Sequence, residues 1–205
     1  MSDESRLYYF YFSTYLLFVS VIFVVQNQPN LAFKVVPLLN AATTGLSFSI
    51  FLIILTNQYL WRWKFFRTIF GIKKPYIKGR WEGNLKSSYS AHQVGYPIVL
   101  EISQTLKKID VCYYDERAFS HSLIADFSAE MEGGPTRLYC VYRNIPTVTN
   151  QAKLQPHTGA MELSVNTNSN EIIGIYYNNS HERQTYGEMV LQFKSRKLLK
   201  QFKDS

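Results

Sequence analysis

The chain has 205 residues, of which 46% are hydrophobic and 18% are charged, and its formal net charge is +7 at pH 7. This excess lies in one segment: residues 61–80 hold seven Lys and Arg and no acid, whereas the charges of residues 1–60 and of residues 81–205 cancel. A basic nucleic-acid-binding domain spreads positive charge over its own surface, so this class is excluded and no DNA or RNA partner is expected. The distribution indicates instead a short segment beside anionic lipid.

Two uncharged runs precede the basic segment, one of 19 residues (7–25) and one of 25 (35–59). A helix of 19 residues is about 28 Å long, which is close to the thickness of the hydrocarbon core of a bilayer. We therefore expect two transmembrane helices in residues 1–60, joined by a polar turn that contains Pro29. The alternative is a signal peptide followed by a buried helix. Asp3 and Glu4 before the first run argue against it, as does the lack of a small-residue cleavage site after that run.

The positive charges also predict an orientation in the membrane. Seven cations follow the second run, whereas the loop between the runs has only Lys34. The positive-inside rule therefore places residues 61–205 and both termini in the cytoplasm. Ala41, Gly45 and Ser49 are four residues apart in the second run, and small residues at this spacing let helices approach closely. This helix-packing face serves either contact between the two helices of one chain or oligomerisation.

From residue 79 onward the hydrophobic period changes to two, as in β-strands. The alternation is clear in Ile98/Leu100/Ile102 and in Ile173/Ile175/Tyr177, for example. Eight short strands without intervening helices favour an all-β, antiparallel, up-and-down barrel whose closure leaves no exposed edge; a two-sheet sandwich is the alternative. The candidate strands are residues 79–87, 97–104, 107–115, 119–130, 136–144, 158–166, 171–178 and 185–194.

The predicted domains are thus a two-helix transmembrane region (1–60), a basic juxtamembrane connector (61–78) and a ligand-binding barrel (79–205). The segment 79–83 reads Gly-Arg-Trp-Glu-Gly, and a Gly-X-Trp on the first strand also opens lipocalins and avidin-like barrels. In those barrels the indole closes one end. We therefore expect Trp81 to be a structural plug, and this match favours a barrel over a sandwich.

Catalytic signatures are missing from the sequence, and binding is the better interpretation. The four histidines are scattered, and G-x-S-x-G, P-loop and G-x-G-x-x-G motifs are absent, so we expect no enzyme activity, no metal and no cofactor. Polar residues recur where strands meet loops. Tyrosine rings offer flat faces to nucleobases, Ser, Asn and Gln bond base edges or hydroxyls, and an Arg fork matches phosphate. The candidate ligand-binding residues are Gln104, Ser120, Ser122, Tyr142, Asn144, His157, Tyr176, Tyr177 and Arg183.

The succession of short motifs resembles one family of proteins. The motifs are 79–83 (GRWEG), 102–105 (ISQT), the strand with Ser120 and Ser122, 142–146 (YRNIP), 157–159 (HTG) and 174–177 (GIYY), with the positions of Arg183 and Gly187 after them. In this order, after two spans and a basic connector, they resemble the two-transmembrane, β-strand-rich effectors associated with CD-NTases in bacterial CBASS antiphage operons.

This resemblance implies a function and assigns roles to residues. A cyclic dinucleotide made by a partner CD-NTase binds the barrel, and the effector then forms a homo-oligomer and disrupts the bacterial inner membrane, which causes abortive infection. It makes Arg183 the phosphate ligand, with Tyr142, Asn144, His157, Tyr176 and Tyr177 in the pocket. Glu182 is adjacent to Arg183 and is an alternative partner for it.

Two other functions compete with this one. A membrane-tethered, lipocalin-like carrier of a small apolar ligand requires an apolar lumen without a polar ring at its mouth. The serine, asparagine and arginine residues among the candidates argue against it. A lipid-modifying hydrolase requires a base and a nucleophile side by side, and the sequence offers no such pair.

Overall fold

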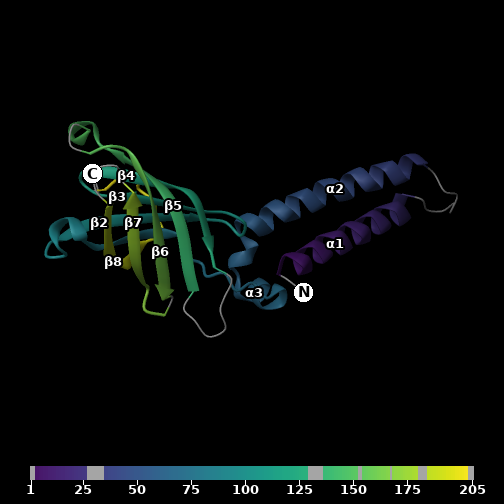
Figure 1. The fold of residues 1–205 in the computed structure, drawn as a ribbon. Helices are drawn as coiled ribbons and strands as arrows, with labels where there is room; N and C mark the ends of the chain where they lie inside the picture. Colours follow the sequence, from purple (N-terminus) through teal and green to yellow (C-terminus); the bar gives the residue numbers. More distant parts are fainter. Residues whose placement is uncertain are drawn as a thin grey trace. The chain divides into compact units, whose positions relative to one another are not determined.

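The computed structural model describes residues 3–26, 35–128, 136–151, 154–166, 168–179 and 184–202 (Figure 1). The chain divides into two compact units, Met1–Lys74 and Pro75–Ser205, which are described separately. The division falls inside the segment that the sequence identifies as a connector, residues 61–78.

The first unit is helical. It consists of α1 (Asp3–Gln26), α2 (Val35–Gln58), a 3-10 turn (Leu60–Arg62) and the short α3 (Lys64–Phe70). The stretches Ser5–Val25 and Leu39–Gln58 are long and apolar enough to cross a membrane, as judged by length and composition. Helix α3 was not expected, because seven residues rich in aromatic and basic side chains give too short a pattern to identify; Gly71 ends it in the left-handed region.

The small-residue face of α2 packs against α1 of the same chain. A Cβ atom at Gly45 would lie 2.8 Å from Cγ2 of Val19, so glycine lets the two helices touch. Ala41 and Ser49 on the same face are buried, and the Ser49 hydroxyl donates a hydrogen bond of 2.9 Å to the carbonyl oxygen of Gly45. Of the two interpretations of this face, the structure shows contact within the chain.

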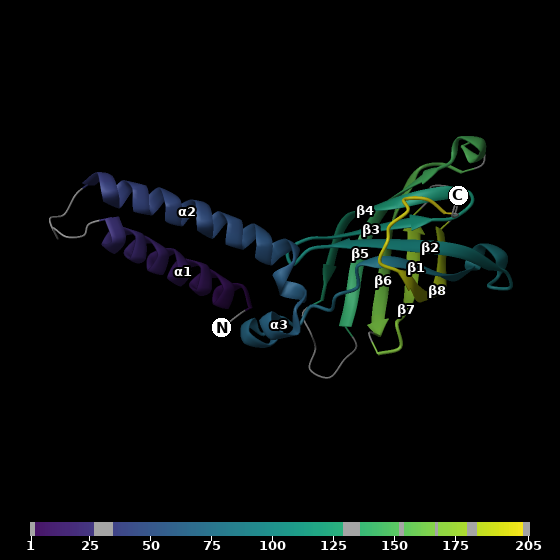
Figure 2. The ribbon, with the colours of Figure 1, turned by 180° about the vertical axis from the view of Figure 1, so that it is seen from behind.

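The second unit is a closed barrel in which every strand pairs antiparallel with its neighbours in sequence, and the last strand pairs with the first. The predicted eight-stranded, up-and-down barrel is confirmed and the sandwich is excluded (Figure 2). The strands are β1 (Gly79–Ser87), β2 (Gly95–Gln104), β3 (Ile109–Tyr114), β4 (Ala118–Phe127), β5 (Thr136–Pro146), β6 (His157–Asn166), β7 (Glu171–Asn179) and β8 (Gln184–Ser195).

Apolar side chains fill the barrel and close one of its ends. Leu100, Leu138 and Leu163 are among the fully buried side chains of this core. Where β1 begins, the Trp81 indole donates a hydrogen bond of 3.0 Å to the carbonyl oxygen of Ile77, and its ring meets Phe193 edge to face at 5.2 Å. We call this the plugged end. The opposite end, where β1, β3, β5 and β7 finish, we call the polar end.

Two strands differ from the alternation that the sequence suggests. On β7, Ile172 and Gly174 face the interior, whereas Ile173 and Tyr177 are 51% and 54% exposed on the outside. The strand is apolar on both faces, so its pattern does not identify the buried one. On β4, the pairing with β5 shifts between Ser122 and Ile124, and Leu123 is exposed. Such a bulge reverses the side on which the following residues lie.

The C-terminal segment 196–202 crosses the outer wall of the barrel; Figure 2 shows it in yellow. Arg80 donates hydrogen bonds of 2.7 Å to the carbonyl oxygens of Gln201 and Phe202. The Glu101 carboxylate accepts from the backbone N–H groups of Leu199 and Lys200. We call this segment the C-terminal strap. Its anchor is the Arg80–Glu101 ion pair of 3.0 Å, in which both side chains are 3% exposed.

Candidate functional site

Polar side chains line the inside of the barrel at the polar end, above the apolar core. Four of them lie directly opposite one another on four successive strands, β3 to β6: Tyr113, Ser120, Asn144 and His157. Because residues two apart on a strand share a face, the buried positions of Val111 on β3 and Leu138 on β5 fix this row as inward-facing. The regular register thus gathers four polar groups from distant parts of the chain.

A second series continues around the barrel. Tyr142, Gly159, Asn178 and Thr185 are opposite one another on β5 to β8. Tyr176 lies opposite Gly187, which lies opposite Ser87 on β1. We call the polar members of both series the polar ring: Ser87, Tyr113, Ser120, Tyr142, Asn144, His157, Tyr176, Asn178 and Thr185.

Two glycines make room for the tyrosines of the ring. A Cβ atom at Gly159 would lie 2.4 Å from Cζ and from Oη of Tyr142, and one at Gly187 would lie 2.7 Å from Cε1 of Tyr176. Each glycine therefore lets the tyrosine from the adjacent strand lay its ring across the neighbouring backbone. This fixes two flat aromatic faces at the top of the core.

Hydrogen bonds link the ring members in pairs. Asn144 Nδ2 donates to Ser120 Oγ at 2.9 Å, and the hydroxyls of Ser87 and Tyr176 are 2.7 Å apart. The Tyr142 hydroxyl donates to the carbonyl oxygen of Tyr177 at 3.4 Å, which is a weak bond. The Asn144 amide is half-buried and has a further donor and an acceptor to offer to a ligand.

His157 is held in one tautomer. Its Nδ1 lies 3.0 Å from the carbonyl oxygen of Gln155, which can only accept, so Nδ1 carries the proton. Its Nε2 then accepts from Nδ2 of Asn178 at 3.3 Å, while Oδ1 of Asn178 accepts from the backbone N–H of Thr185 at 2.9 Å. The ring of His157 is therefore oriented by hydrogen bonds at both of its nitrogens.

Two phenols of the ring, those of Tyr113 and Tyr142, are uncharged at neutral pH. Burial raises the pKa of Tyr113 well above its usual value, and the nearby Asp115 carboxylate, which accepts from its hydroxyl at 3.0 Å, raises it further. Burial also raises the pKa of Tyr142 above its usual value, with the phenol of Tyr176 adding to the effect. Neither phenol therefore opposes the approach of an anion.

Five of the predicted ligand residues gather in the polar ring: Ser120, Tyr142, Asn144, His157 and Tyr176. Tyr177 is on the outer wall. Ser122 lies at the bulge of β4, where its hydroxyl accepts from the backbone N–H of Val111 at 3.0 Å. Arg183, the predicted phosphate ligand, and Glu182 lie outside the described residues.

Gln104 is at the other end of the barrel. Its side chain is 3% exposed, accepts from the backbone N–H of Ile77 at 2.9 Å and donates to the carbonyl oxygen of Pro75 at 2.8 Å. Both amide atoms thus fasten the segment that leads into β1. The structure does not bring this residue to the polar ring, because β2 ends at the plugged end.

Four ring members were not among the predicted ligand residues: Ser87, Tyr113, Asn178 and Thr185. The period of two identifies the first two. Trp81 and Leu85 on β1 lead to Ser87, and Ile109 and Val111 on β3 lead to Tyr113. A strand pattern that continues to its last residue therefore reveals polar groups that line the end of a barrel.

A hollow of about 600 Å³ lies elsewhere on the second unit. It is lined by Tyr114, Asp115, Glu116, Ala118, Phe119, Thr147 and Phe202. Its charged side chains are two carboxylates, which disfavour a phosphate-bearing ligand by like-charge repulsion. The polar ring has no carboxylate among its own described members, although Asp115 bonds Tyr113, and it offers more hydrogen-bonding groups, so it is the better candidate for an anionic ligand.

Comparison with known proteins agrees with a receptor role for the barrel. A family model described as "Cap15, cyclic dinucleotide receptor domain" matches residues 72–193, which is more than half of the chain and includes seven strands and most of β8. A relative from Staphylococcus schleiferi, "CD-NTase-associated protein 15", is 28% identical over 144 residues, which cover 70% of this chain and 74% of the relative.

Proposed function

Because the chain belongs to the Cap15 cyclic dinucleotide receptor family, whose CBASS effectors it resembles, we propose that it binds a cyclic dinucleotide in the polar ring and then disrupts a membrane. The proposed sequence of events is binding by the barrel, formation of a homo-oligomer, and disruption of the bacterial inner membrane by the two apolar helices. The messenger comes from a partner CD-NTase, as the name of the relative suggests.

The observation that carries this proposal is the polar ring itself. A cyclic dinucleotide presents two flat bases, hydroxyl groups and two phosphates. Tyr176 offers a half-buried aromatic face, and Asn144 offers amide groups that bond base edges or ribose hydroxyls. Tyr142 and Ser120 are 6% and 2% exposed, so they contact neighbouring ring members, and Ser120 holds the Asn144 amide. A carrier of an apolar ligand needs the reverse arrangement, with an apolar, unfilled lumen. Here the lumen is filled by side chains such as Leu100 and Leu163, and its end is polar.

Arg183 is proposed to contact a phosphate of the ligand. It immediately precedes β8, which begins at Gln184 at the polar end. A guanidinium group gives two donors in a fork that matches phosphate, and it would supply the positive charge that the described members of the ring lack. If Glu182 pairs with Arg183 instead, Glu182→Gln should tighten binding by releasing the arginine.

The proposed membrane topology follows from the distribution of positive charge along the chain. A messenger made in the cytoplasm reaches the barrel only if the barrel is cytoplasmic, and the seven cations of residues 61–80 favour that orientation. Reporter fusions at Asn30 and at the C-terminus should therefore report opposite sides of the membrane. A periplasmic C-terminus would contradict both the orientation and the cytoplasmic ligand.

Binding is tested by calorimetry on the full chain in detergent with cyclic di-AMP, cyclic di-GMP and 3′,3′-cyclic GMP–AMP. We expect one of them to bind. Asn144→Ala should weaken its binding about two- to tenfold, and Arg183→Ala roughly ten- to a hundredfold, from the usual energies of neutral and charged hydrogen bonds. Arg183→Lys should recover little affinity if the contact is bidentate.

Asn84→Ala is the matched control, because Asn84 is exposed on the outer face of β1. Its affinity should equal that of the wild type. If none of the three nucleotides binds, the proposed function fails. If Asn144→Ala binds as the wild type does, the polar ring is not the site.

A further inference from the structure

Helix α3 (Lys64–Phe70) keeps its apolar and its basic side chains on opposite sides. Successive residues of a helix are about 100° apart, and this spacing puts all the apolar residues of α3 within an arc of about 140°. This apolar arc consists of Phe65, Phe66, Ile69 and Phe70. The opposite, basic arc consists of Lys64, Arg67 and Thr68. Short as it is, α3 is therefore amphipathic.

One half of the apolar arc is covered and the other half is bare. Phe70 is 6% exposed, and its ring meets the Phe10 ring of α1 edge to face, with 5.0 Å between the ring centroids. Phe66 lies beside Phe70, with 5.4 Å between the centroids. Figures 1 and 2 show α3 next to the N-terminal end of α1. Phe65 and Ile69, on the neighbouring half of the arc, are 70% and 51% exposed. We call these two the bare pair.

The contact with α1 sets the depth of α3 in a membrane. Phe10 belongs to Ser5–Val25, the stretch of α1 that is long and apolar enough to cross a bilayer. Around Phe10, the side chains of Tyr8, Tyr9 and Phe12 are exposed by 64%, 64% and 59%. Aromatic belts rich in tyrosine lie at the boundary between the headgroups and the acyl chains. When α1 crosses a membrane, α3 therefore lies at this boundary.

At this depth, physical chemistry favours one orientation of α3 about its own axis. Seen along that axis, the bare pair is on one flank of the contact with α1, and Arg67 is on the other flank. A charged flank in the hydrocarbon is costly, whereas an apolar flank is stabilised there. The bare pair therefore faces the acyl chains and the basic arc faces the headgroups. Trp63, which precedes α3, is 60% exposed, and an indole also favours the boundary.

We propose that α3 is an interfacial anchor, which lies in the plane of the membrane and binds anionic lipid at the surface where α1 begins and α2 ends. Phe65 and Ile69 insert among the acyl chains. Lys64 and Arg67 bind the phosphate groups of the lipids. This inference goes beyond the proposed function, because it does not depend on a nucleotide. It shares with that function only the insertion of α1 and α2 into a membrane.

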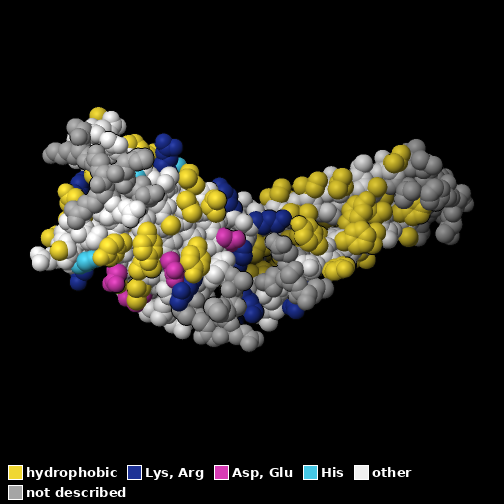
Figure 3. All heavy atoms as spheres, in the orientation of Figure 1, with side chains coloured by type: hydrophobic (Ala, Val, Ile, Leu, Met, Phe, Trp, Pro, Cys, Tyr) yellow, Lys and Arg dark blue, Asp and Glu magenta, His cyan; other side chains and the backbone are white. Residues whose placement is uncertain are grey.

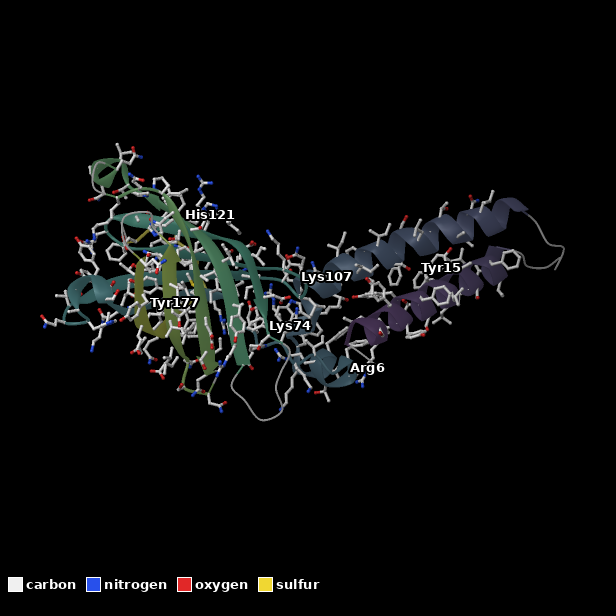
Figure 4. All side chains as sticks on the ribbon, viewed as in Figure 1. Arg6, Tyr15, Lys74, Lys107, His121 and Tyr177 are labelled. Atoms are coloured by element: carbon white, nitrogen blue, oxygen red, sulfur yellow. The ribbon has the colours of Figure 1, made fainter. Side chains whose placement is uncertain are left out.

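The charge around α3 favours anionic lipid over other partners. Residues 61–74 hold five Lys and Arg and no Asp or Glu. Figure 3 shows Lys and Arg side chains on the part of the helical unit that contains α3, and Figure 4 labels Arg6 and Lys74 there. A second copy of this segment would carry the same positive charge and would be repelled. Anionic lipid offers both acyl chains for the bare pair and negative charge for the basic arc.

The test places a polarity-sensitive fluorophore on the full chain in vesicles of phosphatidylcholine with or without phosphatidylglycerol. Cys112→Ala removes the half-buried native thiol, and Cys140 is buried. The fluorophore is attached at Ile69→Cys in the bare pair or at Thr68→Cys, the adjacent exposed position of the basic arc, which is the matched control. Leu17→Cys, at a position that is 63% exposed on α1, reports whether this helix is in the bilayer.

In vesicles with phosphatidylglycerol, we expect nitroxide-labelled lipid to quench the fluorophore at position 69 and aqueous iodide to quench the one at position 68. Lys64→Gln should lower the ratio of lipid-contacting to water-exposed α3 about fivefold, which is the usual contribution of one cation at an anionic surface. Lys86→Gln, at an exposed lysine of β1, should leave this ratio unchanged. Without phosphatidylglycerol, Lys64→Gln and the wild type should give the same ratio.

Two outcomes would overturn the proposal while the helices stay in the membrane, as shown by lipid contact at position 17. One is equal quenching by iodide at positions 68 and 69. The other is protection of position 69 from iodide without quenching by the nitroxide lipid, which would mean that protein covers α3. If position 17 does not contact lipid either, the anchor and the membrane step of the proposed function fail together. If no nucleotide binds but position 69 contacts lipid, the proposed function fails and the anchor stands.

Discussion

The glycines of the polar ring set the position of its tyrosines. Gly159→Ala puts a Cβ atom against the Tyr142 ring, where the separation of 2.4 Å requires the ring to move. Overpacking of this kind costs about 1–3 kcal/mol of the free energy of unfolding. We expect this loss in chemical denaturation, together with weaker nucleotide binding because the aromatic face is displaced.

Gly95→Ala is the control for this variant. A Cβ atom at Gly95 would lie 3.8 Å from Cβ of Asn84, an ordinary contact, so its stability should stay within about 0.5 kcal/mol of the wild type. Wild-type affinity in Gly159→Ala, at reduced stability, would mean that the Tyr142 ring takes no part in binding.

Cys140 is a buried thiol whose environment makes it unreactive. Burial raises its pKa to about 12, and the thiolate is the reactive form, so we expect an alkylating reagent at pH 8 to leave it unmodified until the chain is unfolded. The stability that depends on this proton is fully present below the unfolded pKa of about 9 and is lost as the pH rises through 12. Cys140→Ala should remove this part of the alkaline loss in pH-dependent denaturation. Modification of Cys140 in the native chain at pH 8 would contradict its burial.

Sequence patterns identified about half of the polar ring, and the reason is geometric. Tyr142, Asn144 and His157 were found because they lie where strands meet loops. The same criterion selected Gln104, because a strand–loop junction occurs at both ends of a barrel. Counting strand directions separates the ends: in an up-and-down barrel the second strand finishes where the first one begins. Tyr177 was expected beside the other ligand residues but lies on the outer wall, for another reason. Because β7 is apolar on both faces, its pattern does not show which face points into the barrel.

Among the elements, the C-terminal strap depends on one buried ion pair. Glu101→Gln removes the buried carboxylate that Arg80 faces and leaves the guanidinium with Glu82, whose side chain is 35% exposed. Breaking a buried ion pair by removing one partner lowers the free energy of unfolding by about 3–5 kcal/mol. We expect that loss in thermal unfolding, and we expect trypsin to cleave the strap at Lys197 or Lys200 faster than in the wild type.

Glu82→Gln is the matched control for the strap. Glu82 binds the same arginine at 2.7 Å, but its side chain is 35% exposed and solvent screens the pair. Loss of the Glu82 carboxylate should lower the free energy of unfolding by less than about 1 kcal/mol. The rate at which trypsin cleaves the strap should stay unchanged. Equal effects of the two substitutions would mean that the burial of Glu101 does not strengthen its ion pair with Arg80.

The elements themselves were largely predictable, whereas the strap was not. Strand alternation and uncharged runs depend on local periodicity, so β1 at Gly79–Ser87 and α2 at Val35–Gln58 were found to within a residue. The strap has no period, because its residues bond backbone groups to Arg80 and Glu101, which are about a hundred positions away in the chain. Contacts of that kind are encoded in three dimensions and leave no signal along the sequence.

At the scale of the whole molecule, the receptor has its own core and its own end closure. The second unit begins at Pro75, and Gln104 holds Pro75 and Ile77 against the barrel. A chain that begins at residue 79 would lose the hydrogen bonds of Gln104 to Pro75 and Ile77. It would also lose the carbonyl oxygen of Ile77, which accepts from the Trp81 indole. A chain of residues 75–205 keeps both, so it is the right fragment for separating binding from membrane damage.

The two units are proposed to have different roles, and this gives the final prediction. If the barrel senses the nucleotide and the helices of Met1–Lys74 act on the membrane, residues 75–205 should bind the cyclic dinucleotide with the affinity of the full chain and leave cells intact. The measurement is uptake of a membrane-impermeant dye by cells that also express the partner nucleotide synthase. The full chain should admit the dye, and the full chain with Arg183→Ala should admit it more slowly because its affinity is reduced. Equal dye uptake by cells with residues 75–205 and by cells with the full chain would show that the helices do not cause the damage.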